Sequence, residues 1–459
     1  MLSLLYLYFF PPVCLLFFFY KYIIFPHYVS PLSRVPNAHP TSAISSLWIR
    51  HHRRGGRTAF RLLLAAHKKV GPVIRLSPNE LSVASLEGLR KIYLGGFEKT
   101  EWYVKEFMNY KTPNLVSMLE SRPHAAQKRM ISHVYSKSYV QNSADIKGIS
   151  EALCGRLVEF LRQVTTQREV DVYALNQAVG ADFTSAFLFG SENGTDFISD
   201  SPASEKYFEN WSMKIKGGAG KDKATDEIEA FVLSLCRQTK SLRETQVHKT
   251  TTTSPVVYAQ LSSGLSKLFE RGLDEGKELI IASEMLDHFG AGSETTKITL
   301  TYMQWELSRR PELQSALRDE LLTLNPHFRF TPGWESQELA DAKALDALPL
   351  LEAILKETLR LYPPSPALLP RIVPQSGTTI EGYDVPGGVM VGTSGFVMHM
   401  NEGIFPDALS FKPERWLVGN EKKIEMNCWF WVFGSGGRMC VGSHFAICSE
   451  LFNANLYTF

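Results

Sequence analysis

The chain has 459 residues, of which 44% are hydrophobic and 21% are charged, so it is long enough to bury a large core. A formal net charge of +2 argues against the basic excess of nucleic-acid-binding proteins, and no nucleic-acid partner is expected. The six cysteines are too sparse for a disulfide scaffold and form no CxxC pair, which favours free thiols in a reducing compartment.

The first segment of the chain is apolar enough to cross a membrane. Residues 1–20 carry no charge, and about 20 such residues span a bilayer as a helix. Pro11 and Pro12 are expected to kink that helix, which membrane helices tolerate. A cleaved signal peptide is the alternative, but the start lacks a basic region and no small-residue cleavage site follows. We therefore predict a single transmembrane anchor over residues 1–25.

The flank of this anchor predicts its orientation. No acidic residue occurs before Glu80, whereas six arginines lie between positions 34 and 61. Because positive flanks stay on the cytoplasmic side, the body of the protein is expected to face the cytosol. Four prolines between the span and the body predict a stiff, non-helical hinge over residues 26–45.

The body is predicted to be mainly α with a minor β-sheet region. β-Branched alternation around a Ser-Pro-Asn turn predicts a hairpin, and long apolar-periodic stretches that end in proline predict helices. In chain order the predicted elements are a hairpin at 71–83, helix and loop at 100–140, helix at 145–190, mixed loop and helix at 190–260, long helices at 280–310 and 349–364, and short strands at 367–400.

The long helix at 280–310 contains the stretch AGSETT. Gly292 weakens a helix interior by about 1 kcal/mol relative to alanine. Glu294 and Thr295 follow it, and a threonine can bond the carbonyl four residues back and open the helix locally. An acid–alcohol pair at such a point could hold a small ligand and relay protons. A solvent-facing polar turn is an equally good interpretation of this stretch alone.

A second candidate cluster combines a helix pair with a distant arginine. Glu357 and Arg360 are three residues apart and share a helix face, but the same spacing elsewhere, as in Glu306/Arg309, predicts only a solvated pair. Arg415, in the stretch FKPERWL, could complete a buried triad, because an unpaired buried charge is strongly unfavourable. A proline, an acid–base pair and an aromatic residue in FKPERWL suit a rigid extended turn, and an exposed turn is the alternative to the buried triad.

The third candidate is Cys440 in the glycine-rich stretch FGSGGRMCVG. It could be a buried structural thiol, the commonest fate of a lone cysteine. It could share a zinc ion with His444 and Cys448, four residues apart with Cys428 nearby, although short CxxC knuckles are absent. It could also be the axial thiolate of a haem iron, which would explain the glycines around it and the adjacent Arg438 as a propionate partner.

Taken together, these stretches resemble the cytochrome P-450 family of haem-thiolate monooxygenases, in particular its filamentous-fungal microsomal members. The likeness runs from about residue 46 to the end and includes GPVIRLSPNELSV (71–83) and RPHAAQKRMISHVYSKSY (122–139). Four motifs occur in the family's order. They are AGxETT at 291–296, ExxR at Glu357 and Arg360, PERW at 413–416, and FxxGxRxCxG at Phe433, Gly436, Arg438, Cys440 and Gly442.

The resemblance implies a cytochrome P-450 fold, with a haem domain over residues 46–459, and assigns roles to single residues. Cys440 would be the iron ligand of haem b, and Glu294 and Thr295 would deliver protons. Glu357, Arg360 and Arg415 would form a structural core, and Arg438 and Arg371 would bind propionates. Electrons would come from NADPH through a separate NADPH–cytochrome P-450 reductase, with cytochrome b5 as a further candidate donor. The implied location is the endoplasmic reticulum membrane.

The sequence departs from the family pattern in two places. The family often has WxxxR over one propionate, whereas the matching positions here are His124 and Lys128, with Arg129 beside them. A lysine contacts a carboxylate as a point charge, without the fork of an arginine. Family members also continue for several dozen residues beyond the cysteine helix, and ICSELFNANLYTF differs from their usual continuation. We therefore expect a C-terminally truncated chain that lacks the last strands of the fold.

The resulting functional prediction is oxygen insertion from O2 into a lipophilic small molecule of fungal secondary metabolism, such as a polyketide, terpenoid or alkaloid intermediate. Apolar and aromatic residues near 95–120, 200–240 and 365–375 are expected to line its pocket. Two alternatives stay open. One is a haem-thiolate isomerase or dehydratase that needs no reductase, and the other is an inactive, truncated haem-binding membrane protein.

Overall fold

A computed structural model of the chain describes residues 2–54, 59–164, 169–217, 220–245, 254–267, 274–326 and 339–458. The chain forms two compact units. The first, here called the sheet unit, comprises Met1–Thr100, Ser365–Ser410 and Asn420–Met439. The second, the helical unit, comprises Glu101–Pro364, Phe411–Gly419 and Cys440–Phe459. Each unit therefore combines segments that are far apart in the sequence.

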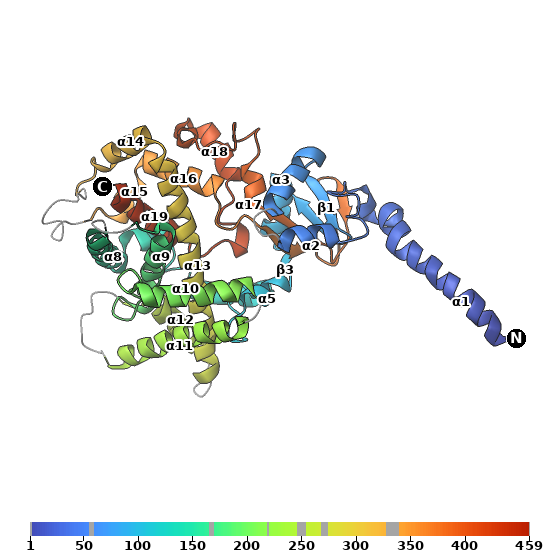
Figure 1. Cartoon of the computed structure of the whole chain (residues 1–459), viewed down its shortest axis with the longest axis horizontal. Helices are drawn as coiled ribbons and strands as arrows, with labels where there is room; N and C mark the ends of the chain where they lie inside the picture. Colours follow the sequence, from blue (N-terminus) through green and yellow to red (C-terminus); the bar gives the residue numbers. More distant parts are fainter. Residues whose placement is uncertain are drawn as a thin grey trace. The chain divides into compact units, whose positions relative to one another are not determined.

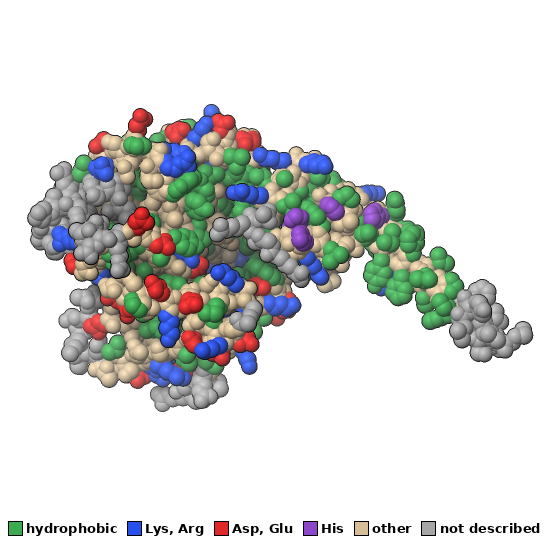
Figure 2. Space-filling model, viewed as in Figure 1, with side chains coloured by type: hydrophobic (Ala, Val, Ile, Leu, Met, Phe, Trp, Pro, Cys, Tyr) green, Lys and Arg blue, Asp and Glu red, His purple; other side chains and the backbone are tan. Residues whose placement is uncertain are grey.

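The N-terminal segment is one long apolar helix (Figure 1). The α-helix α1 (Leu2–Phe19) continues through both of its prolines, and a π-helical stretch, η1 (Tyr20–Val29), follows it. The part from Phe10 to Val29 is long and apolar enough to cross a membrane. Its visible surface is dominated by hydrophobic side chains (Figure 2), as expected for a helix that faces lipid.

The prediction of a non-helical hinge over residues 26–45 is wrong at its start. The π-helical stretch runs past Pro26 to Val29, and the 3-10 helix η2 (Pro31–Arg34) follows after one residue. Pro31 occupies the first position of η2, where proline's missing N–H costs no hydrogen bond. Ser30 supplies the N-cap, because its hydroxyl accepts from the Leu32 N–H. The prolines therefore segment this helical stretch.

The sheet unit contains a five-stranded sheet in the order β1-β2-β7-β4-β3. Its strands are β1 (Val73–Ser77), β2 (Glu80–Val83), β3 (Glu98–Lys99), β4 (Leu368–Ile372) and β7 (Met390–Ser394). The predicted hairpin at 71–83 is confirmed, since β1 and β2 pair antiparallel. The β2–β7 pair is parallel and joins segments some 300 residues apart, and β5 (Thr378–Ile380) pairs with β6 (Tyr383–Val385).

Short helices complete the sheet unit. They are α2 (Leu47–Arg54), α3 (Ala59–Val70), α4 (Leu86–Leu89), η3 (Arg90–Leu94, π-helical), α17 (Gly395–His399), α18 (Asn420–Trp429) and η6 (Gly436–Arg438, 3-10). Its core is built from branched aliphatic side chains of the strands, with Tyr93, Phe97 and Trp431 packed among them.

The helical unit is built almost entirely from helices. They are α5 (Trp102–Phe107), α6 (Ser121–Ile131), α7 (Lys137–Asn142), α8 (Ala144–Val164), α9 (Val172–Phe189), α10 (Ser201–Lys216), α11 (Lys221–Thr245), α12 (Val256–Ser266), α13 (Asp274–Ser308), α14 (Pro311–Leu321), α15 (Ala342–Asp346), α16 (Pro349–Leu361), η5 (Pro413–Leu417, 3-10) and α19 (Ser443–Thr458). The predicted long helices at 280–310 and 349–364 are thus confirmed.

Two helices, α9 and α13, form the centre of the helical unit (Figure 1). Every residue of α9 from Leu175 to Phe189 is buried, as expected for a helix that is enclosed on all sides. Glycines allow its close approach to α13. A Cβ on Gly292 would lie 2.2 Å from the Thr184 hydroxyl oxygen, and one on Gly180 would lie 3.2 Å from the Thr296 Cβ. The glycine of AGSETT therefore serves helix packing.

Candidate active site

The AGSETT stretch lies within a continuous α-helix. The Thr295 hydroxyl donates to the Ala291 carbonyl at 2.9 Å, which is the predicted bond to the carbonyl four residues back, but α13 stays α-helical there. Ala291 is exposed and Thr295 half-buried, although most neighbouring positions on this helix are buried. Asp287, also half-buried, lies one turn earlier on the same face. These three residues form an accessible stripe along α13.

Glu294 points away from this stripe. Its carboxylate accepts hydrogen bonds from the Gln177 side-chain amide of α9 at 2.6 Å and from the Lys297 ammonium at 2.8 Å. The same ammonium lies 4.8 Å from the ring centre of Tyr173. The two residues of the predicted acid–alcohol pair thus have separate surroundings, and only Thr295 lies beside Ala291.

Glu357, Arg360 and Arg415 meet in the core of the helical unit. The Arg360 guanidinium donates to both carboxylate oxygens of Glu357, at 2.9 and 2.7 Å, and the Arg415 Nε donates at 3.0 Å. The Lys412 backbone N–H and the Trp416 indole add two more donors, both at 2.9 Å. The stretch PERW forms the 3-10 helix η5, so the expected extended turn is wrong.

This network keeps a deeply buried carboxylate charged. The side chains of Glu357 and Arg360 are 0% exposed. Burial alone would raise the pKa of Glu357, but the hydrogen bonds and positive charges of Arg360 and Arg415 outweigh it and hold the pKa below its ordinary value. Two cations around one anion satisfy the rule that buried charges need partners.

The glycine-rich loop is divided between the two units. In the sheet unit, Gly436 has φ +69°, and a Cβ there would lie 2.5 Å from the Tyr93 carbonyl oxygen, so this position needs glycine. Phe433 is half-buried. The Arg438 guanidinium forms an ion pair with Glu98 of β3 at 3.2 Å.

The other predicted propionate partner of the sheet unit, Arg371, lies on the neighbouring strand. It is buried in β4, donates to the Pro370 carbonyl at 2.9 Å and lies 5.0 Å from the ring centre of Tyr93. The strands β3 and β4 pair antiparallel, with Glu98 opposite Ile372 and Lys99 opposite Arg371, so Arg371 and the partner of Arg438 lie on adjacent strands. The sequence analysis did not identify Glu98 or Tyr93 as neighbours of these arginines.

In the helical unit, Cys440 is exposed and unbridged as a residue. Many protein atoms surround its sulfur, and this burial raises the pKa of the thiol. The Gly442 backbone N–H and the charge of Lys128 lower this pKa, whereas the carboxylate of Asp287 raises it. An amide donor and a nearby cation are what a thiolate ligand requires.

The remaining predicted residues lie on α6. His124 is buried, and Lys128 is in the last turn, where its charge acts on Cys440. Between them, the Gln127 side-chain amide donates to Glu284 of α13 at 2.6 Å. Sequence analysis missed Gln127 and Glu284, although the spacing of Glu284, Asp287 and His288 along one helix was a visible signal.

The zinc alternative for Cys440 is not supported by the described part of the chain. Among the described residues, possible metal-ligand atoms lie within 4.8 Å of one another at Glu284, Asp287 and His288. Cys440, His444 and Cys448 do not form a group of this kind. The carboxylate of Glu284 is already engaged, because it accepts from the Leu115 N–H and from Gln127 and is paired with His288. We therefore assign no metal ion to these side chains.

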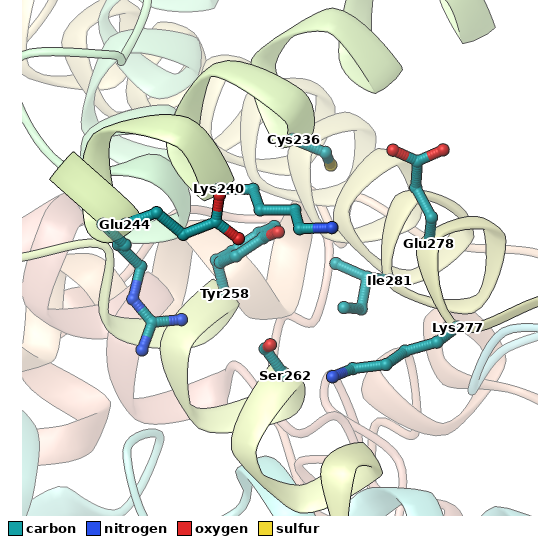
Figure 3. Close-up of a pocket in the computed structure, with 9 residues that line it drawn as sticks. Cys236, Lys240, Glu244, Tyr258, Ser262, Lys277, Glu278 and Ile281 are labelled. Atoms are coloured by element: carbon teal, nitrogen blue, oxygen red, sulfur yellow. The ribbon is translucent and has the colours of Figure 1, made fainter. Parts of the chain in front are cut away.

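A separate pocket of about 430 Å³ lies between α11, α12 and α13 (Figure 3). Three cations, Lys240, Arg243 and Lys277, and two carboxylates, Glu244 and Glu278, line it together with Tyr258. Glu278 is held by the fork of Arg237 with two bonds of 3.0 Å. The nearest lining residue of α13, Ile281, is ten residues before Ala291, or about 15 Å along the helix axis. This pocket is therefore distinct from the Thr295 stripe.

Comparison with known proteins identifies the class. The family model for cytochrome P450 matches residues 40–453 of the chain. The cytochrome P450 monooxygenase avaI of Aspergillus versicolor is 30% identical over 406 residues, which cover 84% of this chain and 94% of that protein. The cytochrome P450 monooxygenase orf2 of Aspergillus niger is 25% identical, in an alignment that covers 93% of this chain and 85% of that protein. The cytochrome P450 monooxygenase ankB of Aspergillus thermomutatus is 26% identical, in an alignment that covers 94% of this chain and 83% of that protein.

The chain belongs to the cytochrome P450 family. It is an oxidoreductase of the monooxygenase class, and the family binds haem through a cysteine thiolate.

Proposed function

We propose that Cys440 is the haem-iron ligand of this enzyme, and one observation carries the assignment. Cys440 is an unbridged, exposed cysteine within the FxxGxRxCxG stretch, and the Gly442 N–H lowers the pKa of its thiol. Haem held by a thiolate supplies O2 activation, because the sulfur donates electron density that favours cleavage of the O–O bond. The Gly442 amide and the charge of Lys128 favour the ionised sulfur, but burial outweighs them and raises the pKa of the thiol, so ionisation would depend on the bound iron.

The remaining cofactor contacts follow the same assignment. Arg371 and Arg438 of the sheet unit, and His124 and Lys128 of the helical unit, are the candidate propionate partners. Arginine offers a bidentate fork to a carboxylate, whereas lysine offers a point charge. Phe433, Gly436 and Gly442 shape the loop around Cys440, and Glu357, Arg360 and Arg415 hold the helical core beside it.

Thr295 is the proposed proton carrier of the site. Its hydroxyl donates to the Ala291 carbonyl at 2.9 Å, and its oxygen is then free to accept a proton donor from the accessible side of α13. Glu294, paired with Lys297 and Gln177, reaches that side only if its side chain rotates away from both partners. In our proposal Thr295 therefore acts directly and Glu294 serves as a proton reservoir behind it.

The proposed reaction is insertion of one oxygen atom into a lipophilic small molecule of fungal secondary metabolism, such as a polyketide, terpenoid or alkaloid intermediate. The related cytochrome P450 monooxygenases from Aspergillus support the monooxygenase reaction of this proposal. Electrons would come from NADPH through a separate reductase, with cytochrome b5 as a second donor. The apolar helix Phe10–Val29 supports attachment to the endoplasmic reticulum membrane, with the catalytic part in the cytosol.

The first experiment is the carbon-monoxide difference spectrum of the dithionite-reduced full chain in microsomes. We expect a strongly red-shifted Soret band for the wild type and none for Cys440→Ser. Cys428→Ser is the matched control, because Cys428 is also exposed but lies outside the motif. An unshifted band in the wild type, or a shifted band in Cys440→Ser, would refute the assignment.

The role of Thr295 is tested by coupling. With reductase and a turned-over substrate, Thr295→Ala should divert NADPH-derived electrons to hydrogen peroxide, since a general acid typically contributes 10²–10⁴-fold to its step. Thr295→Ser keeps the hydroxyl and should restore coupling. Equal product yield per NADPH in all three proteins would remove Thr295 from proton delivery.

A further inference from the structure

The segment 108–120 between α5 and α6, here called the strap, begins with a tight turn of unusual conformation. The Thr112 N–H donates to the Asn109 carbonyl at 2.8 Å, and the two residues between them, Tyr110 and Lys111, have φ of +51° and +53°. Positive φ at both central positions is typical of a type I′ turn, which favours Asn-Gly or Gly-Gly. Because a tyrosine and a lysine resist this conformation, contacts from outside the turn must hold it.

Two helices, α10 and α11, supply these contacts. Tyr110 binds Glu229 of α11 twice: its backbone N–H donates to the carboxylate at 2.7 Å, and its phenol O–H donates to the backbone carbonyl at 2.6 Å. The Lys214 ammonium of α10 donates to the side-chain oxygen of Asn109 at 2.7 Å. Asn109 is buried, and the other three residues are half-buried. We call these four residues the latch, since they join the strap to α10 and α11.

The strap is also bonded to α13, at the end of its accessible stripe. The Ser283 hydroxyl donates to the Thr112 carbonyl at 2.7 Å, and the Leu115 N–H donates to a carboxylate oxygen of Glu284 at 3.1 Å. Ser283 lies four residues before Asp287, so it continues the stripe by one turn, about 6 Å along the helix axis. Ser283 is 0% exposed, whereas Asp287 is half-buried. The strap therefore borders the accessible surface of α13 at this end.

The latch makes the strap and the α10–α11 pair one wall beside the stripe. The helices α10 and α11 pack side by side (Figure 1), and α11 packs on α13. A ligand that is too large to reach the stripe past this wall has to displace the strap, which breaks the Tyr110 bonds. Displacement also lets Tyr110 and Lys111 return to negative φ, so the relief of strain offsets part of the cost of the broken bonds. An element balanced in this way opens at a low free-energy cost.

We propose that Tyr110 and Glu229 determine substrate size in this enzyme: the closed latch lets small molecules reach the stripe, and bulky ones enter only when the latch opens. The inference rests on the proposed haem site beside Thr295 and adds a size limit to its lipophilic substrates. Tyr110 and Glu229 act through the strap, as specificity-determining residues that need no contact with the haem or with the reacting atoms.

The test measures how fast two haem ligands of different size bind the full chain in solubilised microsomes. Imidazole is the small probe and 1-triphenylmethylimidazole the bulky one; both bind iron through an imidazole nitrogen, and the Soret band records binding in stopped flow. Tyr110→Phe keeps the ring but removes the bond to the Glu229 carbonyl. It should accelerate binding of the bulky probe by roughly 2- to 10-fold, the equivalent of one hydrogen bond, and leave the imidazole rate unchanged.

Lys111→Gly is the opposite change in the same turn. Glycine takes positive φ without strain, so this variant should hold the latch closed and slow the bulky probe. Tyr362→Phe is the matched control, because it also removes a half-buried O–H bond in the helical unit, the one to Glu306. It should change neither rate.

An unchanged bulky-probe rate in Tyr110→Phe would overturn the proposal. Equal acceleration of both probes would overturn it as well, because that result reports a general loosening without size selection. Hydrogen exchange in the strap should be faster in Tyr110→Phe than in Tyr362→Phe, and equal exchange would show that the latch does not hold the strap. A wild type without the red-shifted carbon-monoxide band would instead refute the proposed haem function, so the two failures are read from different measurements.

Discussion

At the scale of single residues, the buried carboxylate of Glu357 is the strongest electrostatic constraint in the helical unit. It accepts from two guanidinium groups, one indole and one backbone amide, all at 2.7–3.0 Å. The two cations are arranged around a single anion. Loss of the anion would therefore leave two positive charges facing each other in the core.

Glu357→Ala should accordingly destabilise the helical unit by roughly 3–5 kcal/mol, the cost of an uncompensated buried charge. Urea denaturation followed by circular dichroism measures it. Glu159→Ala, an exposed helix residue with the same ExxR spacing, should change stability by less than about 0.5 kcal/mol. Equal effects of the two substitutions would show that the network does not contribute to stability.

His67 makes the sheet unit sensitive to acid. Its Nδ1–H donates to the Gly71 carbonyl and its Nε2 accepts from the Ser82 hydroxyl, both at 2.8 Å, so the ring is neutral. Burial lowers its pKa to about 4, and the Gly71 bond only partly opposes this. Between pH 6.5 and 4 the unfolded chain therefore binds a proton that the folded chain does not, and stability falls as the pH falls.

The loss should reach on the order of 3 kcal/mol at pH 4, from a pKa difference of about 2.5 units. His67→Gln should flatten the stability profile between pH 7 and 4.5 in urea titrations. His51→Gln, at an exposed histidine, should leave the slope unchanged. An unchanged slope in His67→Gln would show that other groups cause the acid sensitivity.

At the scale of elements, the contact between α9 and α13 depends on glycines where the two helices approach closely. Gly292→Ala would put a methyl group 2.2 Å from the Thr184 oxygen, and overpacking of this kind costs about 1–3 kcal/mol. Gly276→Ala in the same helix meets nothing within 4 Å and should stabilise by up to about 1 kcal/mol.

Thermal denaturation of both variants, and of Gly292→Ala combined with Thr184→Ala, checks this expectation. The double variant removes the obstructing side chain and should recover most of the lost stability. A Gly292→Ala protein as stable as Gly276→Ala would mean that α9 and α13 pack less closely than described.

The helix after Cys440 is less well matched to its surroundings than the other helices at the centre of the unit. Side-chain oxygens of Glu450, Asn453 and Asn455 on α19 are buried without a hydrogen-bond partner among the described residues. Burial raises the pKa of Glu450 to about 8, so this carboxyl group is mostly protonated at neutral pH. These residues lie in the stretch ICSELFNANLYTF, where the sequence departs from the family pattern.

Residue patterns predicted those elements and motifs well that depend only on residues close together in the sequence. The hairpin, the long helices and the spacing of Glu357 and Arg360 follow from periodicity and proline positions. Relations across the fold were harder to predict. Glu306 was expected to form a solvated pair with Arg309, but it is buried, accepts from the Tyr362 hydroxyl and pairs with Arg310. The same spacing in sequence gives no information about burial, which tertiary packing decides.

The Cys440 surroundings show the same limit. The motif identified the cysteine, the glycines and Arg438. It gave no signal for Tyr135, whose hydroxyl is 2.8 Å from Nδ1 of His288 on α13 and whose ring packs against Phe187 of α9 and Phe445 of α19. Long-range contacts of this kind cannot be derived from one chain's local periodicity.

At the scale of the whole molecule, the apolar N-terminal helix is tied to the sheet unit. The Arg75 side chain, buried in β1, donates to the carbonyls of Pro26 and Pro78 at 2.8 Å and of Leu32 at 3.4 Å. The end of the helical segment is therefore part of the folded unit. A cut that removes the membrane span but preserves stability should fall before Pro26.

Deletion of residues 2–24 should release the chain from a carbonate-washed membrane pellet into the supernatant, because the remaining apolar stretch is too short to span a bilayer. Deletion of residues 2–29 should release it as well but lower the midpoint of thermal unfolding, since Arg75 loses its Pro26 partner. A chain that stays in the pellet after either deletion would have another membrane attachment.

The Glu357 network also has a consequence for how the protein is made. Glu357 and Arg360 leave the ribosome together, but Lys412, Arg415 and Trp416 follow 55 to 59 residues after Glu357. At about 5–20 residues per second, the helix α16 exists for roughly 3 to 12 s before its second cation is synthesised. During that interval Glu357 is paired with Arg360 but not yet with Arg415, so the buried charge network of the helical unit is incomplete. Synthesis speed across residues 361–416 is therefore a variable that expression in a foreign host would change.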